Sequence, residues 1–231
     1  MTAITAGEAP VVRVAGRAVH TPDIDVDGTV MTVGSTGVPS VEPLVAVTRN
    51  GRTSFYTRCS PERVAELVSN VGDGEAGDPD AVTDHDPETA RLPVPDLPGL
   101  GAGTRSVLGA CGWRRPASPT DHEAAGGFAD YDSKAVLAAG TSLYGRGWGD
   151  LCHDEPCAPT WETVHDGAGH GAVVVNAHGA DGDRLLLESA PFEVLPGAIA
   201  LAAAVDAAQV ILHASAADTE AVATAPAAIP T

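Results

Sequence analysis

The sequence predicts a chain of two domains, a small α+β domain followed by a partial α/β domain. In the first part of the chain, short β-branched runs, a hairpin signal and one amphipathic helix follow one another, as in a compact α+β unit. Towards the C-terminus a strand, a helix and a second strand alternate, which favours a parallel pair of strands. The 231 residues are enough to bury a core in each domain.

Four runs in the N-terminal part predict β-strands. Residues 11–14 and 29–33 are short and rich in β-branched side chains. Residues 44–48 and 53–56 flank Asn50-Gly51, a pair that tolerates a positive φ at both positions and is typical of a tight hairpin turn. We therefore expect these last two strands to pair with each other.

A helix is expected directly after the hairpin. Ser60 is a good N-cap residue, and Pro61 suits the first helical position. Apolar residues then recur at helical spacing on one face: Val64, Leu67, Val68 and Val71. We expect the first domain to span residues 1–72. Residues 73–103 are rich in Asp, Pro and Gly and predict an exposed acidic linker.

The second domain is expected at residues 104–217. Within it, residues 172–175 and 209–213 predict strands, and residues 191–208 predict the helix that connects them. Pro196 marks either the first turn of this helix or a kink, because proline cannot donate a backbone hydrogen bond. The succession of strand, helix and strand predicts a βαβ unit.

The chain is strongly acidic. Its formal net charge is −18, and Lys134 is the only lysine among 13 basic residues. Such acidity excludes nonspecific binding to nucleic acids or to anionic membranes, because both would be repelled. An acid-rich, lysine-poor composition is typical of proteins that work in concentrated salt, where the Debye length falls to about 3 Å. We interpret the acidity as a halophilic adaptation.

No segment predicts insertion into a membrane, and we expect a cytoplasmic protein. Residues 1–10 lack the basic region of a secretory signal. The apolar tract 194–217 contains Asp206, and an aspartate near the centre of a membrane helix costs about 2.5–3.5 kcal/mol. Residues 218–231 form an Ala/Pro-rich tail. The four cysteines do not predict a disulfide framework.

A glycine-rich stretch precedes the first strand of the second domain. Gly145, Gly147 and Gly149 alternate there with larger residues. Such a loop can adopt positive φ angles and expose its N–H groups, so that a phosphate can approach the backbone closely. The stretch is therefore either a phosphate-binding loop or a glycine-rich surface turn.

The order of segments around this stretch carries a family resemblance. Gly126-Gly127-Phe128 precedes it, residues 173–177 and Asp183-Arg184 follow it, and Pro191 begins an apolar helix. This order resembles that of the FMN- and NADH-binding flavoprotein subunit of respiratory complex I and its relatives in NAD-linked hydrogenases and formate dehydrogenases. The resemblance implies an FMN-binding domain that takes electrons from NADH, as an NADH dehydrogenase does, with other subunits of an NADH-oxidising complex as partners.

The resemblance also assigns cofactor-binding positions. It implies FMN contacts at four residues: Gly145, Arg146, Gly147 and Asn176. Trp148 and Asp150 stand where the family has glycines, and Thr160 stands where it has a lysine. Residues 176–183 lack the carboxylates that flank the flavin and the nicotinamide in the family. These departures remove a cation that would pair with phosphate, and no catalytic residue is assigned.

The N-terminal half carries a second part of the resemblance. Thr36-Gly37, residues 42–45, Phe55-Tyr56 and Pro61-Glu62 match the thioredoxin-like [2Fe–2S] domain that many of these flavoproteins carry. Where the family has cluster cysteines, residues 38–41 contain none. Because a [2Fe–2S] centre needs four thiolates, we expect no such cluster here. We expect no [4Fe–4S] cluster either, since the family's cysteine-bearing helical bundle has no counterpart in this sequence.

Two other hypotheses stay open. Cys152, Cys157, His165 and His170 form the pattern C-x₄-C-x₇-H-x₄-H, a ligand set that suits structural zinc. The alternative for the two histidines is exposure in loops without a ligand. The second hypothesis is a catalytically silent scaffold or assembly paralogue, which keeps the fold of the flavoprotein subunit and has lost its clusters.

Overall fold

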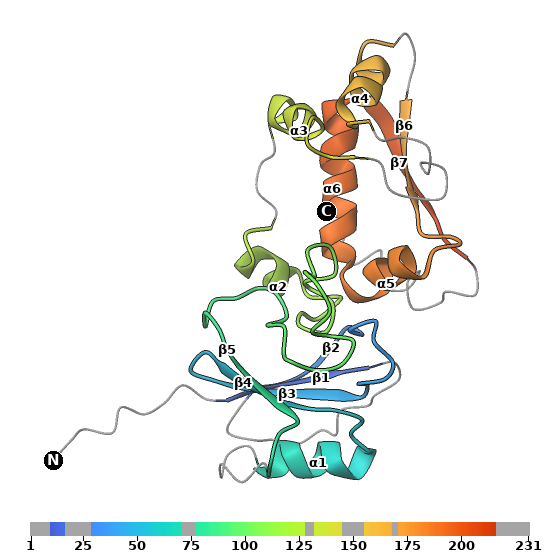
Figure 1. Ribbon diagram of the computed structural model, residues 1–231. Coiled ribbons are helices and arrows are strands. Elements are labelled where there is room, and N and C mark those ends of the chain that lie inside the picture. Colours follow the sequence, from blue (N-terminus) through green and yellow to red (C-terminus); the bar gives the residue numbers. More distant parts are fainter. Residues whose placement is uncertain are drawn as a thin grey trace, which may run out of the picture. The chain divides into compact units, whose positions relative to one another are not determined.

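The computed structural model describes residues 10–16, 29–70, 77–127, 132–144, 155–167 and 171–215 (Figure 1). The chain forms two compact units, which we call unit 1 (Met1–Ala125) and unit 2 (Gly126–Thr231). Both units combine helices with a β-sheet, so the architecture is mixed α/β, in agreement with the sequence. The boundary between the units lies after Ala125, well beyond the linker that the composition suggests at residues 73–103.

Unit 1 is built on a five-stranded mixed sheet with the order β2-β1-β3-β4-β5. The strands are β1 (Val11–Ala15), β2 (Thr29–Val33), β3 (Leu44–Arg49), β4 (Arg52–Tyr56) and β5 (Ala81–Asp84). β1 and β2 are parallel, whereas β1–β3, β3–β4 and β4–β5 are antiparallel. The four strands expected in the N-terminal part are thus confirmed.

The turn between β3 and β4 shows why Asn-Gly stands there. Asn50 has a φ of 49° and Gly51 a φ of 72°, so both adopt the left-handed conformation that the pair tolerates. A Cβ at Gly51 would also lie only 2.6 Å from the carbonyl oxygen of His85. The expected hairpin is therefore confirmed, and glycine is required there by backbone conformation and by space.

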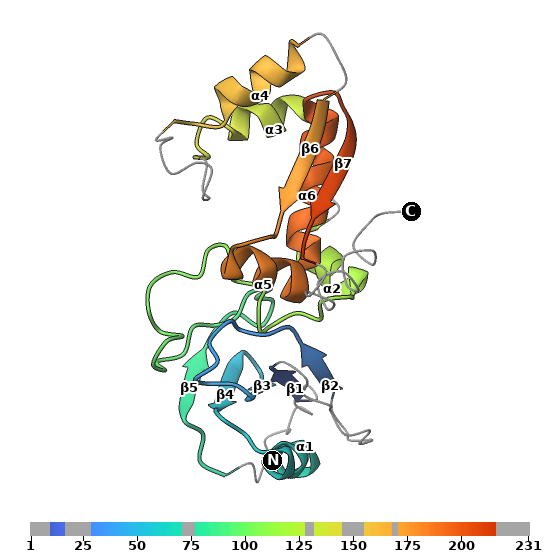
Figure 2. The same ribbon diagram turned by 90° about the vertical axis from the view of Figure 1, so that its right-hand side faces the viewer.

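One face of the sheet is covered by α1 (Pro61–Asn70), as Figures 1 and 2 show. The Ser60 hydroxyl accepts a hydrogen bond from the backbone N–H of Arg63 at 3.2 Å, which confirms the expected N-cap. The helix buries its apolar face against alternate residues of the strands. The side chains in this core are Val12, Val14, Val45, Val47, Tyr56, Cys59, Val64, Leu67 and Val68. Val71, which the sequence places on the same face, lies outside the described residues.

The opposite face is covered by the segment after β5, together with α2 (Pro119–Ala124) (Figure 1). The core on this side consists of Ala15, Val33, Val41, Leu44, Ala46, Phe55, Leu92, Leu97, Leu100 and Trp113. The described residues 77–103 therefore supply an edge strand and three core leucines, which corrects the expectation of an exposed linker. The leucines are spread among Pro and Asp without helical or strand spacing, so no periodic pattern reveals their burial.

Unit 2 contains a parallel pair of strands, β6 (Gly171–Asn176) and β7 (Ala207–His213). Two helices connect them, α5 (Asp181–Ser189) and α6 (Pro191–Ala204), and α6 lies along the pair in both views (Figures 1 and 2). A small core forms where these elements meet, with Ala177, Leu187, Phe192 and Leu195. The parallel arrangement that the sequence predicts is confirmed.

The helices of unit 2 differ in detail from the expectation. α6 begins at Pro191, contains Pro196 and ends at Ala204, because Asp206 turns the chain with a φ of 54° before β7 begins. Within the described ranges, no single helix is long and apolar enough to cross a membrane. α5 and α6 meet the length and composition of a span only as a pair, and they are bent by 99° at their junction.

Two short helices complete unit 2, α3 (Ser133–Ala139) and α4 (Ala158–His165). The Asp132 carboxylate caps α3 by accepting a hydrogen bond from the N–H of Lys134 at 3.2 Å. α3 ends at Gly140, where a Cβ would lie 2.7 Å from the ring of Trp161. Glycine at this position therefore lets α3 and α4 approach each other closely.

Candidate functional site

The best-defined group of polar side chains in unit 2 lies at the carboxyl ends of β6 and β7. We call it the strand-end site: Asn176, His178 and His213. Asn176 and His213 are the last residues of their strands and are partners in the register. The N–H of Ala177 donates to the carbonyl oxygen of His213 at 2.8 Å and extends the strand pairing by one residue. In open α/β sheets, ligands bind outside this edge.

The side-chain oxygen of Asn176 holds the site together. It accepts a hydrogen bond from the backbone N–H of His178 at 3.1 Å and lies 3.0 Å from Nδ1 of His213. An amide oxygen can only accept, so Nδ1 of His213 carries the proton of this bond. Nε2 of the His213 ring then has a free lone pair when the ring is neutral. The two converging donors also fix the orientation of the Asn176 amide.

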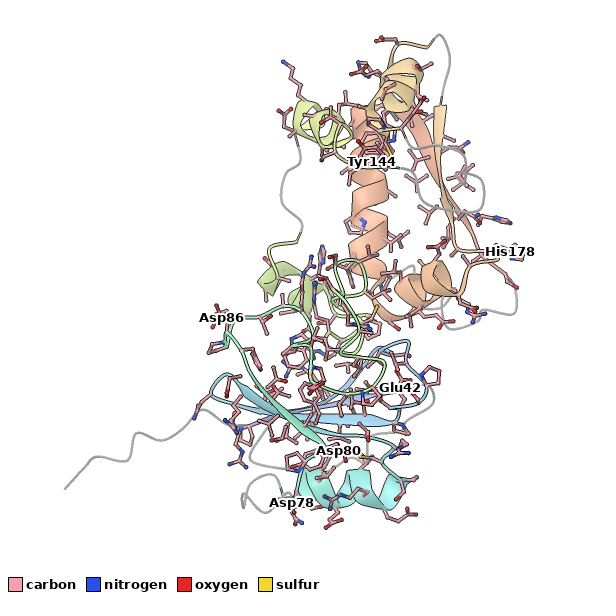
Figure 3. The ribbon with its side chains drawn as sticks, in the orientation of Figure 1. Glu42, Asp78, Asp80, Asp86, Tyr144 and His178 are labelled. Carbon is pink, nitrogen blue, oxygen red and sulfur yellow. The ribbon has the colours of Figure 1, made fainter. Side chains whose placement is uncertain are left out.

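The two imidazole rings of the strand-end site lie close together. Their centroids are 5.3 Å apart, and the ring planes are tilted by 44°. His178 and His213 are both exposed, and Figure 3 shows His178 just beyond the end of β6. The Asn176 side chain therefore presents its NH₂ group, and the histidines their rings, to a molecule approaching this edge.

The structure describes only one of the four implied FMN contacts. Asn176 lies at the end of β6, as the sequence places it, whereas Gly145, Arg146 and Gly147 lie outside the described residues. Sequence reasoning did not single out His178 and His213. A signal was present, since His213 ends the predicted strand 209–213 and His178 lies three residues beyond the predicted strand 172–175.

The residues of the alternative zinc site are described only in part. Cys157 precedes α4 and His165 is its last residue, eight positions further on, which separates them by about 12 Å along the helix axis. Cys152 and His170 lie outside the described residues. In the described ranges, no group of three or more His, Cys, Asp or Glu side chains is arranged to hold a metal.

In unit 1, the Glu42 carboxylate gathers hydrogen bonds from the loop that follows β2. Glu42 accepts hydrogen bonds from the Ser35 hydroxyl at 2.8 Å, from the Thr36 N–H at 2.6 Å and from the Thr36 hydroxyl at 2.5 Å (Figure 3). Thr36 is fully buried, and its carbonyl oxygen accepts from Arg105 at 2.6 Å. A Cβ at Gly112 would lie 2.5 Å from the Thr36 side chain. The loop is thus filled by its own polar contacts.

The two cysteines of unit 1 lie on different faces of the sheet. Cys59 belongs to the core beside α1, and its thiol donates to the carbonyl oxygen of Tyr56 at 3.4 Å. Burial raises the pKa of the Cys59 thiol, although nearby Arg63 opposes this effect. Cys111 is fully buried in the segment that covers the opposite face. The two sulfur atoms therefore cannot bind one cluster together.

A partly buried chain of polar side chains crosses unit 1 from β1 to the segment after β5. Arg13 donates to the hydroxyl oxygen of Thr48 at 3.2 Å, Thr48 is 2.7 Å from Thr53, and Thr53 is 2.7 Å from Nε2 of His85. Burial lowers the pKa of the Arg13 guanidinium to about 10, an effect that the charge of Asp121 partly opposes. A surface cavity of about 210 Å³ adjoins Arg13 and is lined by charges of both signs, so it favours no single class of ligand.

Comparison with known proteins does not assign this chain to a family. No family model and no curated protein matches the sequence. A similar solved structure is titled "Crystal structure of NAD+-reducing [NiFe]-hydrogenase in the H2-reduced state", with a TM-score of 0.38 and 20% sequence identity. The match covers 95% of this chain and 39% of that chain. The chain thus spans about two fifths of the hydrogenase chain that it matches, and the activity of that protein is not carried over to it.

Proposed function

We propose that unit 2 binds FMN at the strand-end site, and that the chain is a flavoprotein-type subunit, or a remnant of one, in an NADH-oxidising assembly. The observation that carries the proposal is the position of Asn176. It ends a parallel strand at the edge where α/β sheets bind nucleotides, and it is the residue to which the family resemblance gives a flavin contact. The other subunits of such an assembly would be its partners.

The described residues of the strand-end site offer a hydrogen-bond donor to the acceptors of a flavin. The Asn176 oxygen already accepts two hydrogen bonds, so its NH₂ group is the part available to a ligand. An NH₂ donor complements the carbonyl oxygens and ring nitrogens of an isoalloxazine. In the proposal, N–H groups of Gly145 and Gly147 hold the phosphate, and Arg146 pairs with it. FMN when bound supplies hydride acceptance and one-electron transfer, and the protein binds and orients it.

We also propose that unit 1 is a thioredoxin-like domain that has lost its [2Fe–2S] cluster. The β3–β4 hairpin and the following α1 support this proposal, because residues 44–45, Phe55-Tyr56 and Pro61-Glu62 of the resemblance lie in these elements. Glu42 and its donors fill the loop where cysteines would stand. Iron and sulfide reconstitution followed by EPR of the reduced protein is the test, and a rhombic signal would contradict the proposal.

A second candidate is the scaffold or assembly paralogue. It is favoured by one specific observation, the replacement of a cluster-binding loop by the Glu42 hydrogen-bond network. A scaffold keeps the fold and binds neither flavin nor cluster. The two candidates therefore differ in a measurable property, the affinity for FMN.

Titration of FMN with the full chain, followed by quenching of flavin fluorescence, distinguishes them. We expect saturable quenching by the native chain. Gly147→Val should abolish it, because a branched side chain blocks the approach of the phosphate. Gly182→Val is the matched control, since nothing lies within 4 Å of a Cβ at Gly182. Asn176→Ala should weaken binding about fivefold, the effect of one hydrogen bond of about 1 kcal/mol.

The opposite results would be equally clear. If the native chain and Gly147→Val quench FMN equally, the glycine stretch does not hold the phosphate. If the native chain does not quench FMN at all, even with a partner subunit of an NADH-oxidising complex present, the flavin proposal fails and the scaffold is the better description.

A further inference from the structure

The two histidines of the strand-end site are spaced as they would be around one metal ion. Zinc–imidazole bonds are about 2.0–2.1 Å long, and two imidazoles on a tetrahedral ion have ring centres about 5 Å apart. The centroids of His178 and His213 are 5.3 Å apart. This centroid distance is compatible with one metal ion shared by the two rings.

Asn176 prepares His213 for this role. Its oxygen receives the proton on Nδ1 of His213 at 3.0 Å, which leaves the Nε2 lone pair free in the neutral ring. Histidines that bind metals commonly donate their other ring N–H to an oxygen in this way, and the hydrogen bond fixes both tautomer and ring orientation. The hydrogen bond that His213 donates to Asn176 thus selects the ring form that binds a metal.

The backbone holds both histidines in place. His213 ends β7, and its carbonyl oxygen accepts the N–H of Ala177 at 2.8 Å. The N–H of His178 donates to the same Asn176 oxygen at 3.1 Å. The Asn176 oxygen therefore links the backbone of His178 to the ring of His213. Both histidines are restrained before a metal binds, so less conformational entropy is lost on binding.

From this geometry we propose that His178 and His213 form a binding site for a divalent transition-metal ion such as Zn²⁺, Ni²⁺ or Cu²⁺. Imidazole nitrogen is a ligand that these ions prefer, in contrast to Mg²⁺ and Ca²⁺. Two protein ligands leave the remaining coordination positions to water or to a second molecule, as in open metal sites. The net charge of −18 raises the local concentration of cations near the chain.

This proposal does not rest on FMN binding, and it differs from the Cys/His pattern around α4. It uses neither cysteine nor His165, and it is tested without flavin. Failure of one proposal therefore leaves the other standing.

The test is a titration of the metal-free full chain with Zn²⁺ by calorimetry, repeated with Ni²⁺ and Mg²⁺. We expect His178→Ala and His213→Ala each to lower the affinity for one equivalent of Zn²⁺ by about tenfold or more, because each removes one of two chelating ligands. His85→Ala is the control, because His85 is a histidine of unit 1 that belongs neither to this site nor to the Cys/His pattern around α4. That variant should bind as the native chain does, and Mg²⁺ should not compete.

Two Asn176 variants test the role of the hydrogen bond. Asn176→Leu should weaken Zn²⁺ binding by about tenfold, because His213 loses the oxygen that orients it, whereas Asn176→Asp retains an acceptor and should restore binding. Binding of Zn²⁺ by His178→Ala and His213→Ala as tight as that of the native chain, or equal weakening in His85→Ala, would overturn the proposal.

A second measurement needs no variant. Cu²⁺ at a low molar ratio broadens the NMR signals of the imidazole protons that lie next to it. We expect selective loss of the His178 and His213 ring signals in the native chain, before those of His85 and His165. Broadening of all histidine signals at the same ratio would contradict a specific site.

Discussion

The guanidinium carbon of Arg13 lies 3.8 Å from the centre of the Trp113 ring, and Nε of the same arginine donates to the Trp113 carbonyl oxygen at 3.1 Å. Arg13 is on β1, and Trp113 is on the segment that covers one face of the sheet. A single side chain therefore joins β1 of unit 1 to the covering segment through a cation–π contact and a hydrogen bond.

Arg13→Met should destabilise unit 1 by about 1–3 kcal/mol, since it removes the cation–π contact and two hydrogen bonds. Arg13→Lys should recover little of this loss, because an ammonium group lacks the planar fork of donors. Arg52→Met is the control, with an expected loss below about 1 kcal/mol for an exposed ion pair with Asp84. Urea unfolding followed by circular dichroism measures all four proteins. Equal effects at Arg13 and Arg52 would contradict the role of Trp113.

Glu42→Gln should destabilise unit 1 by about 1–3 kcal/mol. The carboxylate accepts from three donors of Ser35 and Thr36, and a glutamine NH₂ would face some of these donors without an acceptor. Glu66→Gln removes the same charge from a pair with Arg63 on the surface of α1 and should cost less than about 1 kcal/mol. If both variants unfold at the same urea concentration, the Glu42 network does not stabilise the loop.

Asp80 should make stability depend on pH in the acid range. Hydrogen bonds from the Thr57 N–H and hydroxyl lower the pKa of the Asp80 carboxyl below its ordinary value. The unfolded chain then takes up a proton more readily than the folded chain, so this contribution is present above about pH 4 and is lost as the pH falls through the folded pKa.

Thermal melts from pH 6 to pH 3 test this effect. The melting temperature of the native chain should fall further over this range than that of Asp80→Asn, which has no carboxyl at position 80 to protonate. Asp78→Asn is the control, because it removes a nearby charge and leaves both Thr57 hydrogen bonds intact (Figure 3). The same slope for the native chain and Asp80→Asn would count against the prediction.

Salt should stabilise the whole chain. At 0.1 M salt the Debye length is about 10 Å, and at 1 M it is about 3 Å, so the repulsion among carboxylates falls steeply over this range. With a net charge of −18, we expect the melting temperature to rise from 0.1 M to molar NaCl. A flat or falling melting temperature would show that the acidity is not an adaptation to salt.

Local signals in the sequence predicted the elements that depend on neighbouring residues. Asn50-Gly51 fixes the hairpin, and Ser60 with Pro61 fixes the start of α1, because each acts on its own backbone. The burial of Leu92, Leu97 and Leu100 could not be predicted in this way. The sheet that buries these leucines is formed from distant parts of the chain. The sequence around them has the composition of a linker.

The strand-end site was predictable only in part. Asn176 was singled out through the family resemblance, whereas its pairing with His213 follows from the register of β6 and β7. A register joins residues that are far apart in sequence, and no pattern near His213 encodes it. The implied phosphate contacts at Gly145, Arg146 and Gly147 stay predictions.

The Arg13–Trp113 contact also gives unit 1 an optical reporter of its own. Trp113 is the only tryptophan of residues 1–125, and 3% of it is exposed. An indole shielded from water emits at shorter wavelength than a hydrated one. In a variant that carries Trp148→Phe and Trp161→Phe, the remaining emission comes from Trp113. A red shift of this emission would report exposure of the core on one face of the unit 1 sheet, separately from any event in unit 2.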